Sequence, residues 1–232
     1  DHALLTDISG LKNIDPANIG GAQGLYLTDN PELAVCNLPN FCTYLSNPAN
    51  THPRTISGNK STCLNVAAIQ ATCTCPTGDW TFNTQAQLNE FGALYAHCTD
   101  ITLNNVVIGY VSGATLSDIT DLTPLQNITA VTGSLVIRSN SYLTNLDGLS
   151  AVTSIGGDLD FYGNFALINV NGLSSLTSIG GYLSISGNPA LTNVNGLSAL
   201  TSIGDYLFIG SNASLTNVNG LSALTSIGDY LF

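Results

Sequence analysis

A repeat of 24 residues occupies the second half of the chain, from Ile119 to Phe232. Aligned units read LTNLDGLSAVTSIGGDLDFYGNFA from Leu143 and LINVNGLSSLTSIGGYLSISGNPA from Leu167, and a fifth unit begins at Leu215. A period of this length is typical of solenoids, in which each repeat buries its apolar side only against its neighbours. The repeat therefore predicts a stack of similar units whose outer surfaces carry the function.

Seven positions in each repeat are apolar. In the unit that begins at Leu143 they are Leu143, Leu146, Leu149, Val152, Ile155, Leu159 and Phe161. Alternation of apolar and polar residues in GDLDFYG and GYLSISG indicates a strand with one buried face. We expect shorter strands at Leu143–Leu146 and Val152–Ile155, separated by Asn, Gly and Ser corners. These features predict a mainly β fold, a parallel β-solenoid with about three sides and 24-residue turns that rise about 4.8 Å each.

Asparagine recurs at two corners of the repeat. One column is Asn140, Asn164, Asn188 and Asn212, and the other is Asn145, Asn169, Asn193 and Asn217. Such side chains satisfy backbone groups at corners and bond to one another. An ion or ligand site is the alternative, but the columns contain no other type of ligand.

The first 118 residues differ from the repeats. Residues 5–14 and 24–33 match parts of one repeat, whereas residues 36–73 contain two short helical stretches and four Cys. A solenoid needs caps that cover the apolar interior at its ends. We therefore expect three segments: 1–73, the last turn and C-terminal cap of a first solenoid; 74–118, the N-terminal helical cap and first turn of a second; and 119–232, five repeats with the last one incomplete.

The segment from Cys75 to Cys98 reads CPTGDWTFNTQAQLNEFGALYAHC. Its apolar residues recur at helical spacing, at Leu88, Phe91 and Leu94. The spacing predicts a helix over residues 84–96, with Thr81 or Asn83 as its N-cap. We interpret this segment as the cap of the second solenoid.

Several motifs together resemble the receptor L domain, the leucine-rich-repeat-like β-solenoid of the insulin and epidermal growth factor receptor ectodomains. They are CPTG from Cys75, the amphipathic helix, HCTDITL from His97 and the repeats that follow, with NPELAVCN from Asn30 similar to that family's C-terminal edge. The LTSIGG units also resemble repeats of secreted bacterial surface proteins and fungal cell-wall proteins. The chain departs from the receptors in having no furin-like cysteine-rich module, because one residue separates Cys73 from Cys75. The resemblance implies the fold and an extracellular location, but not hormone binding.

All six cysteines lie between Cys36 and Cys98, outside any zinc-binding spacing. An even number in this pattern indicates disulfides in an oxidising, extracellular setting. The helical cap pairs Cys75 with Cys98, at the two ends of its segment. The resemblance and the need to close the first cap imply two further pairs, Cys36–Cys63 and Cys42–Cys73.

Composition argues against several classes of protein. Apolar residues make up 44% of the chain, which is ample for a core and unlike a disordered segment. Four basic and fifteen acidic residues give a net charge of −11, so the clustered positive charge that nucleic acids and anionic membranes require is missing. No stretch approaches the roughly 20 apolar residues of a membrane helix. The lack of any Met predicts a piece of a processed or longer protein.

No residue pattern indicates an enzyme, a cofactor or a metal site. The three His, at positions 2, 52 and 97, lie outside the repeats, and no G-x-S-x-G motif is present. Asp158 and Asp160 lie on the outer face of one strand, about 7 Å apart by strand rise, and we interpret them as solvated. A Thr column at Thr153 and its equivalents is only one residue wide, whereas an ice-binding surface needs a flat array of two.

The candidate binding surface is the outer face of the longest strands. Its aromatic residues are Tyr162, Tyr182, Tyr206, Phe208 and Tyr230. Exposed aromatic rings favour binding to sugar rings or to a protein surface. The alternative is that the stacked rings only stabilise neighbouring strands, as cross-strand pairs do.

We therefore expect a non-enzymatic extracellular or cell-surface protein, used for adhesion or as a structural segment of a surface fibre. The alternative is a receptor-like ectodomain that binds one protein or carbohydrate ligand on the long-strand sheet. The expected partners are a protein or carbohydrate surface, or further copies of the chain through self-association or end-to-end stacking, without a cofactor. Three N-glycosylation sequons, at Asn59, Asn127 and Asn212, matter only in a eukaryotic secretory pathway.

Overall fold

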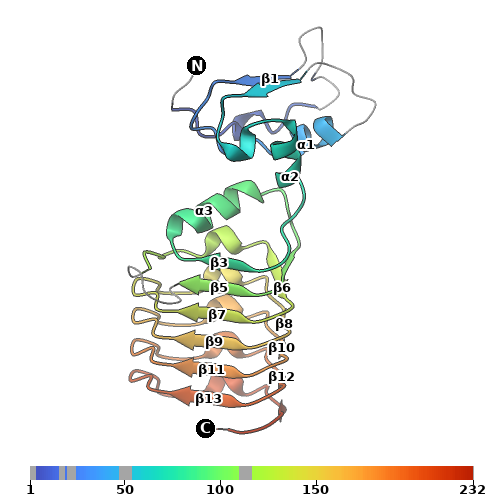
Figure 1. Ribbon diagram of the computed structural model, residues 1–232. Helices are drawn as coiled ribbons and strands as arrows, with labels where there is room; N and C mark the ends of the chain where they lie inside the picture. Colours follow the sequence, from blue (N-terminus) through green and yellow to red (C-terminus); the bar gives the residue numbers. More distant parts are fainter. Residues whose placement is uncertain (1–3, 16–18, 20–24, 47–53, 110–116, 232) are drawn as a thin grey trace. The chain divides into compact units, whose positions relative to one another are not determined.

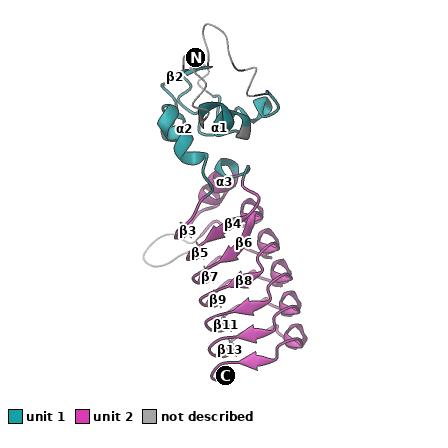
Figure 2. Ribbon diagram, turned by 90° about the vertical axis from the view of Figure 1, so that its right-hand side faces the viewer, with its two compact units in different colours: residues 1–75, 93–97 teal, residues 76–92, 98–232 magenta. Residues whose placement is uncertain are grey.

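A computed structural model describes residues 4–15, 19, 25–46, 54–109 and 117–231 of the chain. The chain divides into two compact units (Figure 2). The first unit comprises residues 1–75 and 93–97, and the second comprises residues 76–92 and 98–232.

The second unit is built on two parallel sheets, each with six strands among the described residues (Figure 1). The first, which we call the long-strand sheet, contains β3 (Trp80–Phe82), β5 (Val106–Gly109), β7 (Leu135–Arg138), β9 (Leu159–Tyr162), β11 (Leu183–Ser186) and β13 (Leu207–Gly210). The short-strand sheet contains β4 (Ile101–Leu103), β6 (Ile128–Val131), β8 (Ser154–Ile155), β10 (Ser178–Ile179), β12 (Ser202–Ile203) and β14 (Ser226–Ile227). Each complete repeat contributes one strand to each sheet, so Leu159 pairs with Leu183, 24 residues later. The expected mainly β fold with parallel strands is confirmed.

The interior of the second unit consists of the apolar positions of the repeat. In the repeat that begins at Leu143, each of the seven predicted positions has an exposed fraction of at most 1%. The register of 24 residues places identical positions of successive repeats beside one another. Burial of these columns drives the stacking, because each apolar side chain leaves water only when the next repeat covers it.

The prediction of a strand at Leu143–Leu146 is wrong. That part of each repeat leads instead into a short 3-10 helix: η4 (Thr123–Leu125), η5 (Asp147–Leu149), η6 (Asn171–Leu173), η7 (Asn195–Leu197) and η8 (Asn219–Leu221). Asn145 starts this corner, because its side-chain oxygen accepts a hydrogen bond of 3.0 Å from the backbone N–H of Asp147. At Gly148 an added Cβ would overlap the backbone carbonyl of Leu122 in the preceding repeat, so only glycine allows this approach. The predicted strand at residues 152–155 is also shorter, as β8.

The predicted helix is α3 (Gln85–Leu94). The side chains of Leu88, Phe91 and Leu94 are buried, as their spacing predicted. Its N-cap is Thr84 rather than Thr81 or Asn83. The Thr84 hydroxyl accepts from the backbone N–H of Gln87, and the Gln87 side chain accepts from the N–H of Thr84, which is a capping box.

The first unit contains a small parallel pair, β1 (Leu25–Thr28) with β2 (Arg54–Ser57), and two helices, α1 (Pro39–Ser46) and α2 (Val66–Thr72). Two short 3-10 helices, η1 (Ser9–Leu11) and η3 (Ser61–Cys63), complete its described elements. The helices correspond to the two expected helical stretches. Strand β2 was not predicted, because it has only one buried residue, Ile56. The signal was present nevertheless, since ISGN at residues 56–59 recurs at residues 185–188.

Disulfides cross-link the helices and loops of the first unit. Cys36 is bonded to Cys63 and Cys42 to Cys73, the pairs that the resemblance implied. Cys75 and Cys98 are also disulfide-bonded. A small unit with one short parallel pair depends on such cross-links, because its core is limited.

Candidate functional site

The outer face of the long-strand sheet presents three columns of side chains. The first column is Ser134, Asp158, Tyr182, Tyr206 and Tyr230. The second is Val136, Asp160, Ser184 and Phe208, and the third is Arg138, Tyr162, Ser186 and Gly210. All five aromatic residues predicted from the sequence therefore lie on this one face, because outward positions alternate with the buried ones along each strand.

Tyr182 and Tyr206 form a face-to-face stack. Their ring centroids are 4.7 Å apart, and their ring planes differ by 9°. The spacing equals the distance between neighbouring strands, so the two rings follow the rise of the repeat. Because these rings cover each other's faces, the geometry favours the interpretation that they stabilise neighbouring strands. Tyr230, in the next repeat, is 62% exposed.

An ion pair with a buried carboxylate lies beside this stack. Asp160 is only 4% exposed. Its Oδ2 accepts a hydrogen bond of 3.1 Å from Nε of Arg138 and a second one from Nη2 of the same side chain. Arg138 comes from the preceding repeat, where its position is diagonal to Asp160 across the pair β7 and β9. The interpretation of Asp160 as a solvated carboxylate is therefore wrong, because the guanidinium covers it.

Asp158 is also engaged by its neighbours. Its Oδ1 accepts a hydrogen bond of 3.1 Å from the backbone N–H of Tyr182, and its Oδ2 accepts one of 3.5 Å from the Ser134 hydroxyl. The carboxylate thus links three successive repeats at the start of their long strands. Neither carboxylate on this face is surrounded only by water.

The charges of this cluster shift the protonation of its neighbours. Burial, with Asp160 and Asp158 nearby, raises the pKa of the Tyr182 phenol. Burial and the nearby carboxylates of Asp158, Asp205 and Asp160 raise the pKa of Tyr206. The hydrogen bonds to Asp160 raise the pKa of Arg138. At neutral pH the phenols of Tyr182 and Tyr206 are therefore neutral.

Tyr162 on β9 and Phe208 on β13 are two further exposed rings of this face. Tyr162 is 55% exposed, and its ring lies about 3.5 Å from where a Cβ at Gly187 would be. Phe208 is 37% exposed and covers Gly210, where an added Cβ would come within 2.8 Å of its ring. Gly210 thus leaves room for the Phe208 ring, whereas a Cβ at position 187 would make only an ordinary van der Waals contact with Tyr162. Tyr162 adjoins the ion pair, since it pairs directly with Arg138.

The Arg138–Asp160 pair was not predicted from the sequence. A signal existed, because Arg138 is the only basic residue after Lys60 in a chain with four. The period of the repeat does not predict this contact, because it aligns residues that are 24 apart whereas these two are 22 apart. The site that the structure assembles is therefore a polar cluster of Arg138, Asp158 and Asp160 next to the tyrosine stack.

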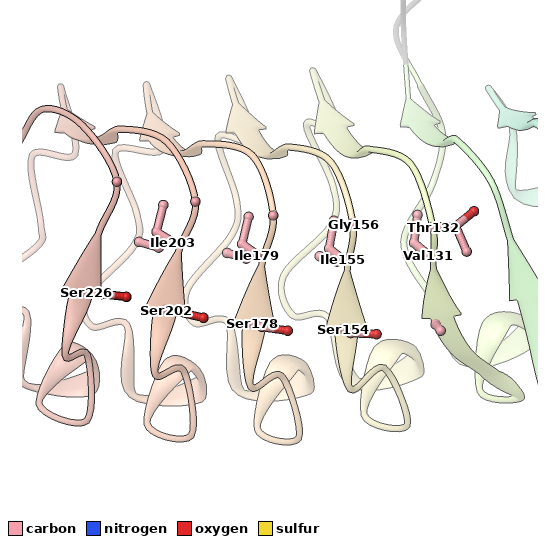
Figure 3. A pocket seen from close by; sticks show the side chains of 14 residues that line it. Val131, Thr132, Ser154, Ile155, Gly156, Ser178, Ile179, Ser202, Ile203 and Ser226 are labelled. Carbon is pink, nitrogen blue, oxygen red and sulfur yellow. The ribbon is translucent and has the colours of Figure 1, made fainter.

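A shallow groove of about 620 Å³ runs along the outer face of the short-strand sheet (Figure 3). Small outward residues produce it, with one Ser and one Gly in most repeats. The serines are Ser154, Ser178, Ser202 and Ser226. Next to them, the hydroxyls of Thr153, Thr177 and Thr201 each donate to the backbone carbonyl of the residue one repeat earlier, at 3.0 to 3.2 Å. The groove presents hydroxyls and backbone, and none of its described lining residues is charged.

The disulfides indicate the kind of environment in which the protein folds. Bonds at all six cysteines are typical of an oxidising, extracellular environment. Among the helices of the described residues, none has the length and apolar character needed to cross a membrane. No family model, curated protein or solved structure matches this chain.

Proposed function

We propose that this chain is a non-enzymatic segment of a secreted or cell-surface protein. It is a β-solenoid of the receptor L-domain type, and it serves in adhesion or as part of a surface fibre. The observation that carries the proposal is the regular stacking of similar repeats around a buried apolar interior. The interior residues of such a stack stabilise the fold, and the outer faces of the two sheets are available for contact with other molecules.

The long-strand sheet is the adhesive face in this proposal. It carries the exposed rings of Tyr162, Phe208 and Tyr230, which provide apolar area with a polar rim. The carboxylates beside them are engaged by Arg138, Tyr182 and the Ser134 hydroxyl, which supports a binding role rather than acid–base catalysis.

An adhesion assay tests this function. Beads coated with the chain are passed over surfaces of chitin, cellulose, β-glucan and fibrous protein, and their retention under flow is counted. The variant Tyr162→Ser/Phe208→Ser should reduce retention at least tenfold on the surface that the wild type prefers. The matched control is Ser178→Ala/Ser202→Ala on the short-strand sheet, which should leave retention unchanged. Equal retention of the two variants, with both folded, would contradict the assignment of the face.

A second candidate function is recognition of one defined ligand by the same sheet. It is favoured by the cluster of Arg138, Asp158 and Asp160, which breaks the otherwise regular pattern of the repeats at one place. A single polar cluster predicts saturable one-to-one binding, whereas an adhesive array predicts several equivalent contacts along the stack. Binding stoichiometry, measured by titration calorimetry with oligosaccharides of the preferred surface, separates the two.

A further inference from the structure

The three sequons differ in what their Asn side chains do in the folded protein. We propose that Asn127 is the N-glycan acceptor of this chain in a eukaryotic secretory pathway, and that Asn59 and Asn212 are structural asparagines that remain unmodified.

Asn59 uses both hydrogens of its amide inside the first unit. It is 8% exposed, and its Nδ2 donates to the carbonyl of Leu27 at 2.8 Å and to that of Cys63 at 3.2 Å. Its Oδ1 accepts from the backbone N–H of Asn30 at 3.1 Å. A sugar on Nδ2 would replace one of these donors and would need space that the core does not provide.

Asn212 belongs to the column of Asn140, Asn164, Asn188 and Asn212, which we call the corner ladder. Its Nδ2 donates to the carbonyl of Ile185 at 2.8 Å, and its Oδ1 accepts from the backbone N–H of Asn188 at 3.0 Å. Asn164 and Asn188 make the same two bonds with their own neighbours, although neither is part of a sequon. The ladder therefore accounts for Asn212 without any modification.

Asn30 and Asn59 reproduce this arrangement in the first unit. The Asn59 oxygen accepts from the backbone N–H and the amide of Asn30, as the Asn164 oxygen does from Asn140. The Asn residues of two of the three sequons thus have the same structural role, the pairing of corner asparagines between adjacent strands.

Asn127 has no such role among the described residues. It lies between η4 and β6 and is partly exposed. Its backbone carbonyl accepts from the N–H of Ile101 at 2.9 Å, but its side-chain amide makes no hydrogen bond with the described part of the protein. Within the described part of the protein, no contact therefore requires this amide.

The equivalent positions of the later repeats show what the fold needs at this point. They are Ala151, Ser175, Ala199 and Ala223, all small and partly exposed. Asparagine is therefore not required for stacking at position 127. The exposure of this position in every repeat leaves room for a substituent that extends into solvent.

The modification is a transfer from a lipid-linked oligosaccharide pyrophosphate. The amide nitrogen of Asn127 forms a bond to the first carbon of the sugar and loses one proton. The bond between that carbon and the pyrophosphate oxygen breaks, and the lipid pyrophosphate leaves. The hydroxyl of Thr129 completes the sequon.

The test is secretion of the whole chain from a eukaryotic cell line, followed by peptide mapping after digestion with a glycosidase that converts glycosylated Asn to Asp. We expect conversion at position 127 and unconverted Asn at positions 59 and 212 in the folded, protease-resistant fraction. Asn127→Ala, which restores the residue of Ala151, should abolish the glycan and leave the fold intact. Asn127→Gln is a second variant with the same expected result. A glycan on Asn59 or Asn212 of the folded protein, or an unmodified Asn127, would overturn the proposal.

Discussion

Replacement of Asn164 by Ala tests the corner ladder at a fully buried position. The Asn164 side chain accepts from the backbone N–H of Asn140 at 3.2 Å and donates to the carbonyl of Ile137 at 2.8 Å. It also bonds to the side chains of its two neighbours in the ladder. Those neighbours keep other partners in the variant: the Asn140 amide retains the carbonyl of Ile108, and the Asn188 oxygen retains the N–H of residue 164.

Two backbone groups therefore lose their side-chain partner in a buried environment. Each unsatisfied buried group costs about 1–2 kcal/mol, so Asn164→Ala should lower the free energy of unfolding of the second unit by about 2–4 kcal/mol. Asn212→Ala removes equivalent bonds at Asn188 and Ile185, but this position is partly exposed and water can replace them. We expect about 0.5–1.5 kcal/mol there.

Denaturant unfolding followed by fluorescence measures this difference. Trp80 is the only tryptophan of the chain and lies in β3, so its signal reports the second unit. The two variants have the same substitution in the same column and differ in burial, which makes Asn212→Ala the matched control. Equal losses for both variants, or losses below about 0.5 kcal/mol for both, would refute the argument that the ladder stabilises the fold by pairing buried backbone groups.

Three further predictions concern the ion pair, the tyrosine stack and the disulfides. Arg138→Met should lower the free energy of unfolding by about 1–3 kcal/mol. This loss is smaller than for a fully buried pair, because the Arg138 side chain is 45% exposed. The double variant Arg138→Met/Asp160→Asn should recover most of the lost stability in the same assay. The raised pKa of Tyr182 favours the neutral phenol of the folded state, so its contribution to stability is fully present below the ordinary value of 10.0 and is lost as pH rises through the higher folded value. In an absorbance titration of phenolate, Tyr182→Phe should remove a component that ionises above pH 10.0; an unchanged curve would contradict the shift. Cys36→Ala/Cys63→Ala removes a disulfide that closes a loop with a sequence separation of 27, and it should destabilise the first unit by about 3–4 kcal/mol. We expect faster proteolysis within residues 1–75. Unchanged cleavage would show that the bond is dispensable.

Much of the second unit follows from its period. Identical residues 24 apart must lie beside one another once the repeats stack, so the burial of Leu143 and its equivalents and the outward column of Tyr182 and Tyr206 were predictable. The segments that do not follow the repeat were less predictable. Strand β2 has one buried residue and no alternation, and Thr84 competes with nearby polar residues for the cap of α3.

The sequence by itself determined the register, because a strict repeat allows only one alignment of its apolar columns. It also determined which face of each long strand is outward, since that follows from alternation. Only the tertiary structure decided how individual polar groups are used. Arg138 reaches Asp160 on a diagonal that no period describes. The amides of Asn59 and Asn212 are engaged, while that of Asn127 makes no hydrogen bond with the described residues. These differences arise because a hydrogen bond requires a particular geometry between two side chains or backbone groups, whereas burial of apolar area requires only that the right faces meet.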